Sequence, residues 1–189
     1  MASAQDKHPM DWSPDGRFLL YNNTDPKTGS DIGAVPVVGD RKPFPVVQTE
    51  FDQRDAQFSP DGKWIAYESN ESGRVEIYAQ LFPGPGIKTQ ISTTGGAQVR
   101  WRRDGKELFY IALDGRLMAV PIRLASTTQT IEAGSPIPLF ATRVGGALSF
   151  PFNQQYDVSS DGQRFLMNTV TDEEVAAPIT VILNWKAKP

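Results

Sequence analysis

The sequence predicts an all-β fold, a β-propeller of about four four-stranded antiparallel blades. One turn motif occurs four times, as Ser-Pro-Asp-Gly from Ser13 and Ser59 and in looser form from Arg102 and Ser159. Each copy is followed by a strand-like apolar run, such as Phe-Leu-Leu-Tyr at residues 18–21. Successive copies lie about 45 residues apart with a longer last interval, which is the length of one propeller blade.

The repeated motif has the chemistry of a tight turn between two strands. Ser13 suits the first position of a type I turn, and Pro14 presets the backbone of the second. Gly16 can adopt a positive φ and so leave the turn as a G1 bulge. We therefore assign a structural role to the aspartates of the four turns, Asp15, Asp61, Asp104 and Asp161. The alternative, a β-sandwich with similar hairpins, does not explain four copies in phase.

The order of turns and strands divides the chain into blades. We expect a loose polar leader over residues 1–6 and a single propeller domain over residues 7–189. The expected blades are residues 7–48, 53–92, 97–141 and 154–185. An insertion rich in Ser, Thr and Gly within residues 124–136 accounts for the longer last interval.

The last blade is expected to be incomplete, one strand short of four. The apolar stretch at residues 179–185 would then be an unpaired sheet edge, which is a liability for a folded protein. Two outcomes stay open at this point. The chain closes as a small four-bladed ring, or two copies pair through their blade edges into a larger ring, and we favour this homodimer.

Composition excludes several classes of site. The absence of cysteine excludes disulfides and thiolate metal sites. The single histidine, His8, excludes sites that need two, and any Ser-His-Asp triad would have to use it. A net charge of −3 without a basic run argues against a nucleic-acid partner. No apolar run is long enough to predict a membrane span within the chain.

The inner strands of a propeller line its channel, so their polar residues are the candidate ligand-binding residues. They are His8, Asp11, Asp52, Arg54, Asp55, Gln57, Gln98, Arg100, Gln155 and Asp157. Three of them, Asp11, Asp55 and Asp157, could converge on a hard divalent cation such as Ca²⁺, which would be the cofactor. Such a metal could polarise a phosphoryl or carbonyl oxygen and activate water. In the competing interpretation the aspartates pair with arginines or cap strand ends.

The repeats resemble the TolB-like, WD-related β-propeller repeat of bacteria, through residues 12–17, 58–67 and 76–78. Residues 82–86, 100–108 and 179–185 also resemble the C-terminal part of propellers linked to bacterial serine/threonine protein kinases and winged-helix regulators. That resemblance implies a sensor propeller without a catalytic motif. It also implies an extracytoplasmic or periplasmic localisation, as in the parent family. The chain itself carries no kinase catalytic-loop motif.

Two functions follow as expectations. The first is a non-catalytic sensor or scaffold module that binds a protein or a small ligand at the channel mouth, and for it we predict no catalytic residue. The alternative is a metal-dependent hydrolase of esters or phosphotriesters, with the metal held by the inner-strand carboxylates.

Overall fold

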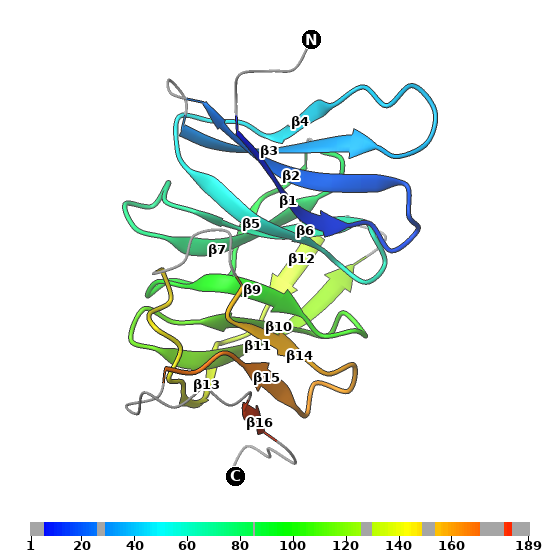
Figure 1. Cartoon of the computed structure of the whole chain (residues 1–189). Coiled ribbons are helices and arrows are strands. Elements are labelled where there is room, and N and C mark those ends of the chain that lie inside the picture. The colour runs from blue at the N-terminus through cyan, green and yellow to red at the C-terminus, as the bar shows by residue number, and fades with distance from the viewer. Residues whose placement is uncertain are drawn as a thin grey trace.

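The computed structural model describes residues 6–25, 29–84, 86–125, 130–148, 154–170 and 180–182. These residues form sixteen strands in four antiparallel sheets. The sheets are stacked in chain order, with the first and the last at opposite ends of the stack (Figure 1). The prediction of an all-β propeller with blades of about four strands is therefore confirmed.

Each sheet is a meander that starts at its inner strand. The first sheet contains β1 (Lys7–Trp12), β2 (Phe18–Asp25), β3 (Gly29–Pro36) and β4 (Phe44–Val47). The second contains β5 (Gln53–Phe58), β6 (Trp64–Ser69), β7 (Glu76–Leu81) and β8 (Thr89–Gln90). The third contains β9 (Ala97–Trp101), β10 (Glu107–Ile111), β11 (Arg116–Ala125), β12 (Thr130–Ala133) and β13 (Ile137–Ala141). The fourth contains β14 (Tyr156–Val158), β15 (Phe165–Met167) and β16 (Thr180–Ile182).

The repeated turns have the geometry that their sequence predicts. Gly16 has a φ of 71°, and its N–H donates to the carbonyl oxygen of Ser13 at 2.8 Å. The Ser13 hydroxyl donates to Asp15 at 2.6 Å and accepts the Phe18 N–H at 2.9 Å. The same bonds recur in the turns that begin at the serines of the second and fourth blades.

The third turn replaces the serine with an arginine. The Arg102 guanidinium donates to Asp104 and to Glu107, both at 2.6 Å. The Asp104 carboxylate still accepts the backbone N–H two residues later, that of Lys106, at 3.0 Å. The turn is therefore held by an ion pair where the others use a hydroxyl.

The insertion in the third blade is a structural element, whereas its composition suggested a loop. β11 reaches Ala125, within the residues where the sequence predicts the insertion. Its first part pairs with β13 and its last part pairs with β12, so two strands share the outer side of β11. Ile122 at the start of the pairing with β12 and Ile131 on β12 are buried against residues of the second sheet.

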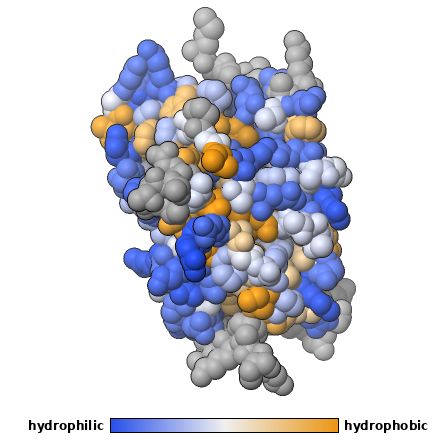
Figure 2. Space-filling model, turned by 180° about the vertical axis from the view of Figure 1, so that it is seen from behind, coloured by the Kyte–Doolittle hydropathy of each residue, from blue (hydrophilic) through white to orange (hydrophobic). Residues whose placement is uncertain are grey.

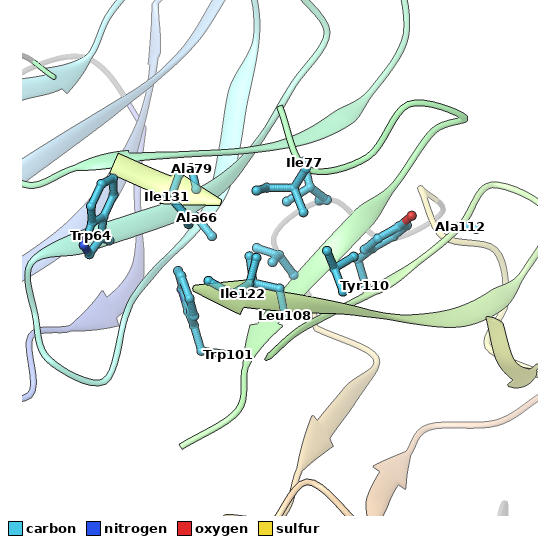
Figure 3. Close-up of a cluster of buried hydrophobic side chains, with 13 residues drawn as sticks. Trp64, Ala66, Ile77, Ala79, Trp101, Leu108, Tyr110, Ala112, Ile122 and Ile131 are labelled. Atoms are coloured by element: carbon cyan, nitrogen blue, oxygen red, sulfur yellow. The ribbon is translucent and has the colours of Figure 1, made fainter. Parts of the chain in front are cut away.

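The hydrophobic core lies between successive sheets. Figure 3 shows the cluster between the second and third sheets, in which side chains of Trp64 and Ile77 face those of Trp101 and Leu108. Similar clusters join the first sheet to the second and the third to the fourth. Each blade is therefore stabilised mainly by the blades on either side of it.

The described part of the chain forms an open arc. No described strand of the first sheet pairs with a strand of the last, and these two sheets lie at opposite ends of the stack (Figure 1). A small closed four-bladed ring is therefore not what the described residues form. Most of the edge predicted at residues 179–185, and residues 1–5 of the predicted leader, lie outside the described residues.

The surface is mostly hydrophilic on the face seen in Figure 2, and apolar side chains are scattered over it in small groups. A search of the described residues finds no helix with the length and apolar character needed to cross a membrane.

Candidate functional site

Backbone bulges with a positive φ shape the inner strands of the second and third blades, and β1 has a register shift between Pro9 and Asp11. Asp55 on β5 has a φ of 52° and Gln98 on β9 has a φ of 59°, and the strand register shifts at both places. Residues other than glycine rarely adopt this left-handed conformation, which costs on the order of 1 kcal/mol. A bulge turns the backbone out of the ladder. Both residues occupy the same place in their repeats, so the bulge belongs to the blade design.

The bulge at Gln98 joins three blades. The Gln98 N–H donates to Glu68 of the second sheet at 2.6 Å. The side-chain amide of Gln98 accepts the Gln155 N–H at 2.9 Å and donates to the Ala147 carbonyl at 2.8 Å. Since Gln98 is only 1% exposed, the structure uses this predicted channel residue to connect blades.

The residues just before the aromatic or aliphatic residue of each turn also reach the next blade. Asp11 accepts the Phe58 N–H of the second sheet at 2.7 Å. The Gln57 amide, oriented to suit its neighbours, donates to the Val99 carbonyl at 3.1 Å and accepts from Arg100 at 2.7 Å. Arg100 in turn lies 3.9 Å from the Asp157 carboxylate of the fourth sheet. These four predicted channel residues thus form a chain of contacts from blade to blade.

A buried acid pair lies beside these contacts. Glu68 on β6 is 1% exposed, and burial together with the nearby Asp55 carboxyl raises its pKa to about 8. Burial also raises the pKa of Asp55, while its hydrogen bond to Glu68 acts in the opposite direction. Arg54 holds the second oxygen of Glu68 at 3.0 Å. Each carboxyl in its charged form makes ionisation of the other less favourable, so the two titrate as a pair.

Sequence reasoning missed Glu68, although a signal was present. It is an acidic residue in the run Trp-Ile-Ala-Tyr-Glu-Ser, which otherwise reads as a strand buried on both faces. A carboxyl in such a strand needs a partner, and Arg54 and Gln98 supply it. Glu68 lies on the second strand of its blade, outside the inner strands from which the candidate residues were predicted.

The remaining predicted site residues lie apart from this pair. Asp52 precedes β5, where its carboxylate accepts the Ser30 N–H and its own N–H donates to Asn70, both at 2.9 Å. It therefore joins the first sheet to the second. His8 lies exposed on β1, opposite Asn22 in the strand register.

One small cavity opens among the inner strands, which we call the channel cavity. It measures about 40 Å³ and is lined by Pro9, Met10, Asp55, Ala56, Gln57 and Gln154. The side-chain oxygen of Gln154 is buried there and has no hydrogen-bond partner. A cavity of this size has room for roughly one to three water molecules. Its polar lining is rich in acceptors, so it suits a small donor group.

The structure does not assemble the predicted metal site. Within the described ranges, no group of three or more His, Cys, Asp or Glu side chains could hold a metal ion. Asp11 is bonded to backbone amides, Asp55 to Glu68, and Asp157 lies beside Arg100. The three aspartates are thus engaged separately.

No protein-family model matches the sequence, and a search of curated proteins finds no match either. Solved structures do match. TolB from Acinetobacter baumannii superposes with a TM-score of 0.69 at 18% identity, covering 97% of this chain and 42% of that one. An oligogalacturonate lyase in complex with manganese gives a TM-score of 0.62 at 9% identity, covering 92% and 50%. The β-propeller domain of the Trilobed protease from Pyrococcus furiosus, with an open velcro topology, gives 0.53 at 12% identity, covering 98% and 56%.

This chain therefore spans about half of the length of the proteins that it resembles, or somewhat less. At these identities the likeness concerns the fold, and a shared fold does not carry a shared activity. The chain is a β-propeller module that resembles TolB.

Proposed function

We propose that this protein is a non-catalytic sensor or scaffold module that binds a protein or a small ligand at the mouth of the channel cavity. The observation that carries the proposal is Gln154, which lines the same cavity as Asp55 and has a buried side-chain oxygen without a hydrogen-bond partner. Asp11, Gln57 and Gln98 on the inner strands are instead bonded across the blades. A free acceptor on a residue that lines a cavity marks a place where a ligand can add a bond.

The cavity limits the chemistry of that ligand. An acceptor oxygen beside a carboxyl calls for a donor, and a primary ammonium such as a lysine side chain is the simplest. A volume of about 40 Å³ admits only such a head group. The rest of the ligand would lie on the surface at the mouth, where a peptide or protein segment has room.

The role of a sensor or scaffold rests on the sequence alone, in which residues 82–86 and 100–108 resemble propellers of kinase-linked and winged-helix regulators, while no family model matches the chain. That resemblance implies a propeller without a catalytic motif of its own. A binding module is the role that such a domain can have beside a separate effector.

The test is a titration of the ¹⁵N-labelled protein with two end-blocked tripeptides, Ala-Lys-Ala and Ala-Glu-Ala. We expect the lysine peptide to shift amide signals around residues 54–57 and the glutamate peptide to leave them unchanged. Gln154→Leu should abolish the shifts, because it removes the free acceptor. Gln163→Leu, the same change on an exposed turn, should preserve them. Equal shifts with both peptides, or none with either, would contradict the proposal.

The second candidate is a metal-dependent hydrolase of esters or phosphotriesters. It is favoured by the buried Asp55–Glu68 pair, since carboxyls with strongly raised pKa values gather at functional sites. It is tested by turnover of activated esters and phosphotriesters, with and without EDTA. Turnover that EDTA removes, a divalent metal restores and Asp55→Asn abolishes would replace the binding proposal. Turnover at background level would eliminate the hydrolase.

A further inference from the structure

The second strand of each blade alternates between two neighbours. Ile65 and Tyr67 on β6 pack in one cluster with Leu20 of the preceding sheet. Leu108 and Tyr110 on β10 occupy the same places in the next repeat, and they pack against the second sheet. These two positions of every repeat thus face the blade before.

The residue between these positions faces the blade after. Ala66 packs against the third sheet, and Phe109 packs against the fourth. The rings of Phe109 and Phe165 meet edge to face with their centroids 5.1 Å apart. Adjacent blades therefore meet in one recurring way. On the second strand of each blade, the middle of these three residues contacts the following blade, and the two residues that flank it, which we call the outer pair, contact the preceding blade.

At the two ends of the arc this pattern leaves residues without a blade to contact. Leu19 and Tyr21 on β2 are the outer pair of the first blade, and no described blade precedes them. Leu166 on β15 is the middle residue of the last blade, and it is 46% exposed. Each end carries a hollow, of about 200 Å³ beside Tyr21 and about 260 Å³ beside Leu166. The ends are thus complementary halves of the interface that recurs inside the molecule.

Asp157 is a polar residue of the last blade that also has no described following blade to contact. Asp11 accepts the N–H of the following residue at 2.8 Å with one oxygen, and the N–H of Phe58 in the next blade with the other. Asp157 occupies the same place in the last repeat and accepts the following N–H, that of Val158, at 2.8 Å. Its side chain is 75% exposed at the point where Asp11 reaches the next blade.

Charged side chains line both hollows. Lys7 and Asp31 line the hollow on the first blade, and Asp157 and Arg164 line the hollow on the last. Lys7 of one copy and Asp157 of the other would be oppositely charged partners where the two ends meet.

We propose that a second copy of this chain covers both ends, so that two arcs form one ring of eight blades about a two-fold axis. The face with Leu166 in each copy packs on the face with Leu19 and Tyr21 in the other. Eight blades lie within the range that propellers adopt, and two copies with two identical interfaces form a closed assembly. The contact is blade face against blade face, which differs from the pairing of strand edges expected from the sequence.

The first measurement is the mass in solution by light scattering after gel filtration. We expect twice the chain mass of 20.8 kDa at protein concentrations up to about 100 µM. Leu166→Lys should give a monomer, because it places a charge in both interfaces. Leu113→Lys is the matched control, since Leu113 is 43% exposed in a turn of the third blade, and it should stay a dimer.

The sharper measurement is a rescue by mixing. Leu19→Glu should also give a monomer. An equimolar mixture with Leu166→Lys should form a dimer in which one interface joins Lys to Glu and the other is unchanged. Asp157→Lys should weaken the dimer of the otherwise wild-type chain at least tenfold, because it removes an acceptor from the expected interface. Asp157 also lies 3.9 Å from Arg100 within the chain, so the folding of this variant is checked separately.

Three results would overturn the inference. A monomeric wild-type chain would remove the second copy as occupant of the ends. A dimer that both Leu166→Lys and Asp157→Lys leave intact would place the interface elsewhere. Filaments or a ladder of larger species would show contacts that do not close into a ring. Circular dichroism of each variant shows whether it is folded.

Discussion

Glu68 is a carboxyl whose pKa folding raises strongly. Its carboxyl is enclosed by the inner strands, and Asp55 makes its ionisation still less favourable. Arg54 and the N–H of Gln98 compensate only in part. A carboxyl whose pKa is raised in the folded state stabilises that state while it is protonated, and the stabilisation is lost as the pH rises.

We predict that the thermal unfolding midpoint falls between about pH 5 and pH 8 and that Glu68→Gln removes most of this fall. The stabilisation is full below the usual pKa of 4.5 and disappears as the pH passes about 8. Each kcal/mol changes the midpoint of a protein this size by about 2–4 °C. Calorimetry at a series of pH values is the measurement, and Glu132→Gln on the exposed side of β12 is the control. A wild-type midpoint that is constant over this range would contradict the prediction.

At this scale the sequence predicts which side chains matter more readily than what they do. Asp11, Gln57 and Arg100 could be identified because they share one place in the repeat. Their bonds to the next blade could not, since those depend on how two sheets are set against each other. The positive φ of Gln98 also had no signal, because glutamine is not a residue that a left-handed position favours.

The end of β11 and the strand β12 form a paired element where composition predicts an insertion. Residues 124–136 contain the small polar residues typical of an insertion, and that pattern outweighed Ile131. The structure places Ile131 together with Ile122, both isoleucines, in the core between the second and third sheets. Their partners come from another blade, so local sequence could not reveal them.

We predict that Ile131→Ala lowers the free energy of unfolding by about 2–4 kcal/mol, as expected for a buried isoleucine. Glu132→Ala, on the next residue and exposed, should change it by less than about 0.5 kcal/mol. Urea denaturation followed by tryptophan fluorescence measures both. Equal small effects would show that this paired element contributes little to stability.

The turns, by contrast, were predictable in full because their bonds are local. Ser13, Asp15 and Gly16 bond to one another and to residues a few positions away. The backbone bond of the turn recurs at each repeat, although in the third turn the ion pair of Arg102 with Asp104 replaces the serine hydroxyl.

For the whole molecule, the stack behaves as a row of modules coupled to their neighbours. The second and third sheets are covered on both faces, whereas each end sheet has one face that no described sheet covers. The repeat spacing predicted this architecture well. Spacing alone could not predict whether the row closes, since closure depends on the angle between successive sheets.

We predict that amide hydrogen exchange follows the row. In the monomeric Leu166→Lys variant, amides of β6 and β10 should exchange slowest and those of β2 and β15 at least about tenfold faster, since local opening costs least at the ends. In the wild-type dimer the difference should shrink, because both ends are covered. The readout is mass spectrometry of peptides from each blade. Uniform protection in the variant would show that the four blades open together.

The second-strand residues alternate between the preceding and the following blade in every repeat, and this pattern has a consequence for the evolution of such a protein. Since every blade presents the same pair of faces, a duplication that joined two copies in one reading frame would create no new kind of contact. The product would be a single chain of eight blades, and cuts between any two blades would leave the same ring. Each half would then be free to diverge at its own channel residues, while the partner half preserved the fold.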